Sequence, residues 1–439
     1  MDDAGKPALL RAANDNPWYC LATLYGEQPI GKHDPTLAKN NCLAWNRWFG
    51  DMAEDERSRF AQTFAHRTGK PGLPPEPTKH HNFSNTHFDR PIDFHEFLFV
   101  NLVDFTNATF SDFVVFDRAS FSGDAQFFDA TFAQHAWFET ATFTNKASFN
   151  RVTFSGPCCF DSATFKSLAD FDSAHFENFN FRSTAFSRAN FRAAIFGKGA
   201  FESATFFENA SFDSATFSGP IDFDFVAFNR EVSFVNTKFA GQTRFSGARF
   251  ETHVPDFRGA TIHEATEWHD VIWPRPSRHR SAAQRQVYAY ERLKQEMERL
   301  KKHEDEQSFF RRELRARRAL IRKLSGSWIL NILYELFSDY GNSFIRPVLW
   351  LIGVFAAGIA IFTKVPLCAG EPMPFKLAVK LSFSNIFVIL PDRRELVKAV
   401  QDVDCFSNTT QAINAAQSIS GVVLLFLLGL ALRNWYRMK

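Results

Sequence analysis

The chain has 439 residues and a formal net charge of only +2, which allows two or three domains and gives no reason to expect a nucleic-acid partner. Its six cysteines are scattered, so the sequence predicts neither a disulfide framework nor a Cys/His metal site. The N-terminus lacks a basic segment followed by an apolar run, and we therefore expect no signal peptide.

Residues 1–82 are predicted to form a helical region that ends in a linker. Residues 37–49 and 55–67 are rich in aromatic and helix-forming residues, which favours two short amphipathic helices. The proline-rich stretch 70–79 interrupts any helix. We expect the helices to cap the first coil of the repeat that follows, because an open strand edge pairs readily with other chains. A separate binding role for this region is the alternative.

A phenylalanine repeat occupies residues 83–250. Thirty-two phenylalanines follow one another at steps of five or six residues, beginning with Phe83 and Phe88. A helix would rotate each five-residue step by about 140°, and a flat strand would send alternate rings to opposite faces. A coiled β-solenoid brings every ring inward, beside a small residue two positions earlier. The sequence therefore predicts a solenoid over 83–275, with a core that includes Phe110, Phe121, Phe132, Phe143, Phe154, Phe165, Phe176, Phe191, Phe201 and Phe217.

The unit Ala-x-Phe, followed by two or three mostly polar residues, resembles the pentapeptide-repeat family in its Phe-centred form. The resemblance implies a mainly β fold, a right-handed four-sided β-helix about 38 Å long. Some relatives of this fold mimic DNA and block topoisomerases. Residues 83–250 carry 19 acidic and 13 basic side chains, whereas duplex DNA of that length carries about 22 charges. DNA mimicry is therefore the weakest of the functional hypotheses.

Residues 276–325 are predicted to be a basic helical connector. Between 278 and 323 there are 15 basic and 7 acidic side chains, and residues 303–305 suggest a break between two antiparallel helices. Seven basic residues crowd the second helix: Arg311, Arg312, Arg315, Arg317, Arg318, Arg322 and Lys323. They form either a solvated charged face or a contact with an anionic membrane surface, which attracts each such residue by about 1 kcal/mol. We favour the membrane contact because apolar segments follow.

Residues 326–439 are predicted to be an α-helical membrane region. Aromatic residues in 326–345 favour a helix in the membrane interface, and apolar runs predict spans near 348–365 and 412–432. Small residues on the first span would let another helix pack closely: Gly353, Ala356, Ala357 and Ala360. The stretches SDYGNSFIRP, ELRARR and NPWYCLATLYGEQ resemble bacterial membrane-bound pentapeptide-repeat proteins with a C-terminal two-span hairpin.

Residues 375–390, between the two spans, are apolar but short for a span, so we expect an interfacial or re-entrant segment. Polar residues on this segment and on the second span are Ser382, Ser384, Asn385, Asn414 and Gln417. Either they hydrogen-bond to the first span or a neighbouring subunit, or they line a wet pore in a homo-oligomer. The order of segments loosely resembles a two-helix channel module, but the potassium-channel filter T-V-G-Y-G is missing.

A repeat rod without a preceding signal would fold in the cytosol before either span emerges. We therefore expect a multi-pass protein of the bacterial inner membrane with both termini in the cytoplasm. The loop 366–410 would then be periplasmic, where Cys368 and Cys405 at its two ends would form a disulfide. Two unpaired thiols are the alternative.

No pattern of catalytic residues stands out, and we expect neither enzyme activity nor a cofactor. The first functional hypothesis is a membrane-tethered scaffold that binds an unidentified protein at the cytoplasmic face and contacts membrane lipids. The alternative is an oligomeric ion channel or pore with the solenoid as its sensor domain.

Overall fold

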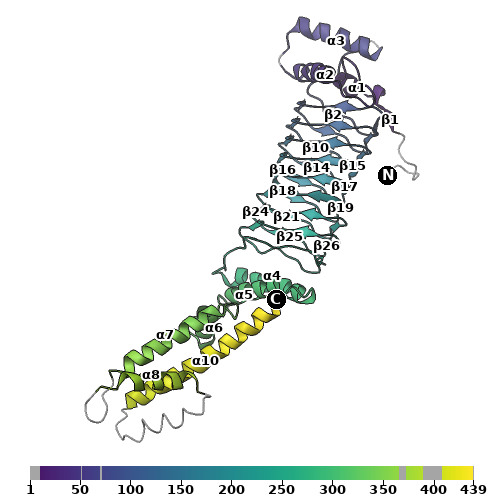
Figure 1. The fold of residues 1–439 in the computed structure, drawn as a ribbon. Coiled ribbons are helices and arrows are strands. Elements are labelled where there is room, and N and C mark those ends of the chain that lie inside the picture. The colour runs from purple at the N-terminus through teal and green to yellow at the C-terminus, as the bar shows by residue number, and fades with distance from the viewer. Residues whose placement is uncertain (1–9, 51, 70–71, 365–371, 389–407, 439) are drawn as a thin grey trace. The chain divides into compact units, whose positions relative to one another are not determined.

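The computed structural model describes residues 10–50, 52–69, 72–364, 372–388 and 408–438. The chain divides into two compact units, Met1–Arg275 and Pro276–Lys439, and each is described by itself. Short strands dominate the first unit and helices the second (Figure 1).

The first unit begins with short elements, and side chains cap the N-termini of its first two α-helices. Asn16 accepts a hydrogen bond from the Trp18 N–H, and Asp34 accepts from two N–H groups of the next helix. A proline occupies the first helical position in both cases, where a missing N–H does no harm. The elements are β1 (Arg11–Ala12), the 3-10 turn Ala13–Asp15, α1 (Pro17–Ala22), α2 (Pro35–Trp48) and α3 (Glu54–Thr68).

These elements cover the first coil of the solenoid. The ring of Trp45 on α2 is fully buried, with its centroid 5.3 Å from Phe97 and 5.5 Å from Phe99. Tyr19 on α1 lies 5.6 Å from Phe88, and β1 pairs in parallel with β3. Aromatic packing and one added strand therefore close an edge that would otherwise expose core rings and unpaired backbone groups.

The solenoid is built from two parallel sheets of 14 strands each. One coil runs through β2, β3, β4 and β5 before β6 pairs with β2. The first sheet holds β1, β3 (Thr86–Phe88), β4 (Ile92–Asp93), β7 (Thr109–Phe110), β8 (Val114–Val115), β11 (Thr131–Phe132), β12 (Ala136–Trp137), β15 (Thr153–Cys159), β17 (His175–Asn180), β19 (Ile195–Ala200), β22 (Thr216–Phe217), β23 (Ile221–Asp222), β26 (Lys238–Phe239) and β27 (Thr243–Arg244). The second sheet holds β2 (His81–Asn82), β5 (Leu98–Phe99), β6 (Val103–Asp104), β9 (Ser120–Phe121), β10 (Ala125–Gln126), β13 (Thr142–Phe143), β14 (Ala147–Ser148), β16 (Thr164–Asp170), β18 (Ala185–Asn190), β20 (Thr205–Phe206), β21 (Ala210–Ser211), β24 (Ala227–Phe228), β25 (Val232–Ser233) and β28 (Arg249–Phe250).

The core consists of columns of stacked phenylalanine rings. Phe88, Phe110 and Phe132 lie in one column, with centroids 4.5 and 4.7 Å apart and ring planes within 5°. The small residue two positions before each ring is also inside, and Ala108 and Ala130 are fully buried. The spacing of the rings follows from the spacing of hydrogen-bonded strands, about 4.8 Å.

The corners of the coils depend on a left-handed residue. Two positions after every second core phenylalanine the backbone has a positive φ, as at Asn85, Asn107 and Thr140. The next N–H then bonds back to the phenylalanine carbonyl, for example from Ala108 to Phe105 at 3.0 Å. Asn and Asp tolerate this conformation better than other side chains do, and glycine tolerates it best.

The coils shorten in the middle of the solenoid. Phe132 pairs with Phe154, 22 residues later, whereas Phe176 pairs with Phe196, only 20 residues later. The pairing register shifts just after Phe154 and just after Phe165, which removes one residue from each of two corners. At these corners neighbouring short strands merge into β15 to β19, which are six or seven residues long.

The predicted parallel β-solenoid of about eight turns, preceded by helices and followed by a helical region, is confirmed. Its right-handedness and its four-sided cross-section stay predictions from the family resemblance.

The second unit begins with an antiparallel helix pair, α4 (Arg280–Arg299) and α5 (His303–Arg317). Lys294 forms an ion pair with Glu313 at 2.6 Å, and Arg317 pairs with Glu291 at 3.4 Å. The turn between the helices lies at 300–302, directly before the break expected at 303–305.

The described part of the unit continues with α6 (Gly326–Ser338), α7 (Ile345–Phe362), α8 (Phe375–Ile386) and α10 (Asn408–Met438). By length and composition, α7 and the segment Gln411–Met438 of α10 are suited to cross a membrane. The short helix α8 packs against both of them. Phe362 and Ala378 belong to a small apolar cluster between α7 and α8.

Candidate functional site

The shortened coils carry an unusual core residue. Phe179 stands two positions before Phe181, where the repeat normally has a small residue. Its ring is only 4% exposed, and its centroid lies 5.0 Å from Phe196 and 5.3 Å from Phe201. The next coil has Gly199 at the paired position, and a Cβ there would lie 2.5 Å from the Phe179 ring. The large and the small residue therefore fit only as a pair.

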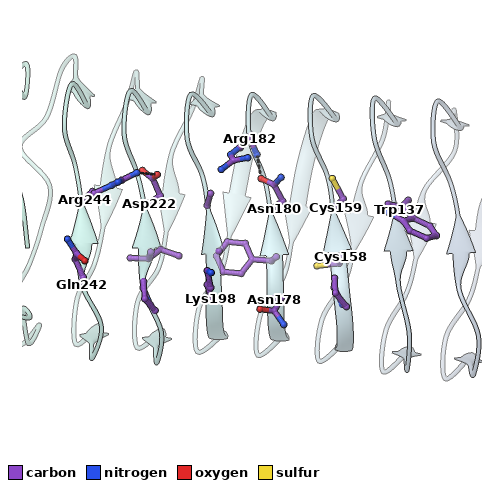
Figure 2. A pocket seen from close by; sticks show the side chains of 16 residues that line it. Trp137, Cys158, Cys159, Asn178, Asn180, Arg182, Lys198, Asp222, Gln242 and Arg244 are labelled. Atoms are coloured by element: carbon purple, nitrogen blue, oxygen red, sulfur yellow. Dashed lines mark hydrogen bonds and ion pairs between the residues drawn. The ribbon is translucent and has the colours of Figure 1, made fainter.

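Two rows of outward side chains run along this face of the solenoid (Figure 2). The upper row in the figure includes Trp137, Cys159, Asn180, Asp222 and Arg244, one from each of several coils. The lower row includes Asn178, Lys198 and Gln242. In the coil of Lys198 the upper position is Ala200, which carries only a methyl group.

Because the side chain of Ala200 is so small, the upper row has a gap in this coil. A groove of about 530 Å³ lies there. Gly199 and Ala200 line the groove together with larger side chains of the adjacent coils. The lining reaches from Trp137 to Arg244, across six coils, which corresponds to about 24 Å along the solenoid.

Within the described ranges, some of the charged side chains of the groove form ion pairs and one does not. Arg244 pairs with Asp222 and, at 3.1 Å, with Asp224, and Arg182 pairs with Glu202 at 3.0 Å. Lys198 is exposed and has no ion pair among the residues that the structure describes. It is therefore the cation in the groove that is most available to a ligand.

The two cysteines of the groove are poorly suited to chemistry. Burial raises the pKa of the Cys159 thiol to about 12 and raises that of Cys158 well above its usual range. Both thiols are therefore protonated at neutral pH, and a protonated thiol is a weak nucleophile and a poor metal ligand. Within the described ranges, no three His, Cys, Asp or Glu side chains come together as a metal site.

Comparison with known families agrees with the geometry. A family model described as "Pentapeptide repeats (9 copies)" matches residues 149–195 and 212–261, which lie within the solenoid. The solenoid is a pentapeptide-repeat domain. No curated protein matches the chain. The family is a structural, non-enzymatic fold family, so its name identifies an architecture and leaves the activity to be argued from this chain.

All ten core phenylalanines expected from the sequence lie inside the pentapeptide-repeat domain. Each is at most 1% exposed: Phe110, Phe121, Phe132, Phe143, Phe154, Phe165, Phe176, Phe191, Phe201 and Phe217. The groove was not expected from the sequence. Its signal was nevertheless present, as a phenylalanine in a small-residue position at 179 followed 20 residues later by glycine at 199.

The polar residues of the C-terminal unit form a hydrogen-bonded network between three helices. Asn385 on α8 donates to Asn414 at 2.7 Å and to Gln417 at 3.0 Å, both on α10. Gln417 donates to Ser382 at 2.5 Å and to the Val354 carbonyl on α7 at 3.2 Å. The buried side chains of Ser382, Asn385 and Gln417 and the half-buried Asn414 therefore satisfy one another inside a single chain.

Ser384 lies beside this network and donates to the Leu381 carbonyl at 2.9 Å. Of the two sequence interpretations, hydrogen bonding to the first span matches this arrangement, and the pore-lining role stays an untested prediction.

The small residues expected to pack α7 against another helix do not contact another helix among the described residues. Ala356, Ala357 and Ala360 are exposed, and a Cβ at Gly353 would meet nothing within 4 Å. Gly358 is the buried position, where a Cβ would lie 2.1 Å from Gln417 Nε2. Toward α8 and α10 the helix turns a different face, and packing of these small residues against a helix of another chain stays a prediction.

Most of the predicted membrane-surface arginines form ion pairs inside the C-terminal unit. Arg311 and Arg315 both bind Asp339, at 2.8 and 2.9 Å, and Arg318 binds Glu335. Burial alone would raise the pKa of Glu335, but hydrogen bonds from Arg318 and Arg315 outweigh it and lower the pKa. The arginines therefore hold α5 against α6.

The remaining basic residues of that set differ in exposure. Arg317 pairs with Glu313 at 2.6 Å, and burial lowers the pKa of Arg312, which bonds to Tyr290. Arg322 and Lys323 are exposed and have no ion pair among the described residues. Cys368 and Cys405 lie outside the described residues, so their pairing stays a prediction.

Proposed function

We propose that this protein is a membrane-tethered scaffold whose pentapeptide-repeat domain binds another protein at the cytoplasmic face. The observation that carries the proposal is the groove, which lies where the repeat departs from its period. The Phe179–Gly199 pair and the methyl group of Ala200 shape the surface there. The regular coils need none of these features to fold.

The tether consists of the two apolar helices, α7 and α10, in the bacterial inner membrane with both termini in the cytoplasm. Support comes from their length and composition and from α6, which exposes Ile329, Leu330 and Leu336. Arg322 and Lys323 lie directly before that helix. An apolar helix face next to exposed basic side chains suits a membrane surface with anionic lipids.

The channel hypothesis finds no specific support. The polar side chains that would line a pore, such as Asn385 and Gln417, are bonded to one another and to α7. A pore would require this network to open and several chains to assemble around it. Current through planar bilayers, altered by Asn385→Leu or Gln417→Leu, is the result that would establish it.

Photo-crosslinking in native membranes tests the scaffold. We would place p-benzoyl-phenylalanine at exposed solenoid positions, including Lys198 in the groove and Lys238 outside it. A discrete protein adduct from at least one solenoid position supports the scaffold. Well-folded, membrane-bound protein that yields no adduct from any face of the solenoid contradicts it.

A further inference from the structure

We propose that the groove around Lys198 binds an extended, acidic peptide segment. This proposal rests on the scaffold function and specifies the chemistry of the partner. It draws on the charge, length and polarity of the groove, which are argued in turn.

Among the described residues, the groove presents one unpaired cation on an acidic domain. Residues 83–250 carry 19 acidic and 13 basic side chains, a net charge of −6. Three of those basic side chains, Arg182, Lys198 and Arg244, line the groove, together with one carboxylate, Asp222. Arg182 and Arg244 are already paired with Glu202, Asp222 and Asp224, so Lys198 is the cation of the lining that no described carboxylate neutralises, and it is the group that draws an acidic ligand to the groove.

The length and direction of the groove suit an extended chain. At about 3.3 Å per residue, about seven residues of extended peptide cover its 24 Å. The backbone groups of the strands beneath already bond between coils, as between Gly199 N–H and the Pro220 carbonyl at 3.2 Å. A peptide on this face therefore cannot add to a sheet, and side chains must recognise it.

Side chains of the required kinds are present. Asn178 carries an amide that both donates and accepts hydrogen bonds, as a peptide backbone requires. Gln242 donates to Glu267 at 3.2 Å, and its amide oxygen remains to accept a hydrogen bond from a peptide N–H. Trp137 is half-buried at one end, with its ring stacked 5.2 Å from His135. The exposed part of this indole is suited to an apolar or proline side chain of the peptide, while Lys198 meets a carboxylate near the middle.

A polyanion fits less well than a peptide. Two of the three cations are already ion-paired, and Asp222 stands between Lys198 and Arg244 along the groove. Nucleic acid and anionic lipid present closely spaced phosphates and bind through many free cations. Carboxylates spaced along a peptide can approach Lys198 while avoiding Asp222.

Fluorescence anisotropy with the full-length protein in detergent tests the proposal. The probe is a fluorescein-labelled eight-residue peptide in which Asp and Glu alternate with Pro and Leu. Its comparison probes are the same peptide with Lys at every acidic position and a single-stranded eight-nucleotide DNA. We expect the acidic peptide to bind at 0.15 M salt at least tenfold more tightly than either comparison probe.

Lys198→Glu reverses the charge at an exposed residue without an ion pair, so the fold should survive, and it should weaken binding of the acidic peptide at least tenfold. Lys238→Glu makes the same change on an exposed lysine outside the groove and should leave binding within twofold. Equal loss in both variants, equal binding of the basic peptide, or tighter binding of DNA overturns the proposal.

Absence of binding by the acidic peptide also overturns it. If protein adducts then still form from other solenoid positions in membranes, the scaffold function stands and only the acidic groove is refuted.

Discussion

Each core phenylalanine is held between two others, so a single truncation leaves a gap that its neighbours cannot fill. Phe143 is 1% exposed, and its ring lies 4.5 Å from Phe121 and 4.6 Å from Phe165. We expect Phe143→Ala to lower the free energy of unfolding by about 3–5 kcal/mol. Asn145→Ala, at an exposed position of the same coil, should change it by less than about 0.5 kcal/mol. Equal thermal melts for the two variants would show that the ring is not part of the core.

The left-handed corners store strain wherever the residue is neither glycine nor Asn or Asp. Thr140 is β-branched and adopts a φ of 54°, which is unfavourable for its side chain. Thr140→Asn should therefore stabilise the protein by about 1 kcal/mol, measured by chemical denaturation. Thr144→Asn is the control, because this exposed threonine is not among the residues with positive φ. A stabilisation common to both variants would refute the strain.

His81 is the least favourable side chain of the first coil. It is fully buried among the rings of Phe49, Trp18 and Trp45, at 4.8, 4.9 and 5.2 Å. Neither ring nitrogen has a hydrogen-bond partner among the described residues. Burial, with a smaller contribution from His80, lowers the pKa of His81 from 6.5 to about 3.

Protonation therefore favours the unfolded state, in which the histidine has its ordinary pKa. The contribution of His81 to stability is complete above about pH 6.5 and is lost as pH falls toward 3, by up to about 1.4 kcal/mol per unit. His81→Phe should raise stability at acidic pH and remove this part of the pH dependence. Hydrogen exchange in α1 and α2 between pH 7 and 4 measures it, and an unchanged pH profile in the variant would contradict the assignment.

At the scale of elements, the close packing of α7 depends on one glycine. A side chain at Gly358 would collide with Gln417 and Ser382, whereas a side chain at Gly353 would project into open space. Gly358→Leu should separate α7 from α8 and α10 and lower the melting temperature in detergent by several degrees. Gly353→Leu, the same substitution on the same helix, should leave it unchanged. Equal effects of the two substitutions would place the helix contact elsewhere.

The sequence predicted elements far better than it predicted surfaces. A five- or six-residue period leaves a solenoid as the only arrangement that brings every phenylalanine inward, so the fold followed from Phe83 to Phe250. The groove did not, because it depends on which side chains the shortened coils bring next to one another. The same holds for α7. Its composition showed that it could pack closely, but only the helix rotation showed that Gly358, rather than Gly353, makes the contact.

At the scale of the whole molecule, the C-terminal helices should decide where the protein resides. We expect the full chain to stay in the membrane pellet after extraction with alkaline carbonate, because α7 and α10 have the length and composition of membrane spans. A chain that ends at Arg275 contains the first compact unit alone and should stay in the supernatant. Release of the full chain by carbonate would reduce the two helices to a soluble or peripheral role.

The repeat also fixes the distance and the direction of each surface site in the first unit, because successive coils are evenly spaced. In the coils before the shortened ones, equivalent residues pair 22 positions apart, as Thr109 does with Thr131. Excision of residues 105–126 would therefore remove one whole coil and keep every phenylalanine column aligned. It would bring the groove nearer to the N-terminal helices by one coil spacing, about 4.8 Å. Excision of half that number would turn the groove toward the opposite side. The number of residues in the repeat thus determines both how far a ligand in the groove lies from the N-terminal helices and toward which side of the solenoid it faces.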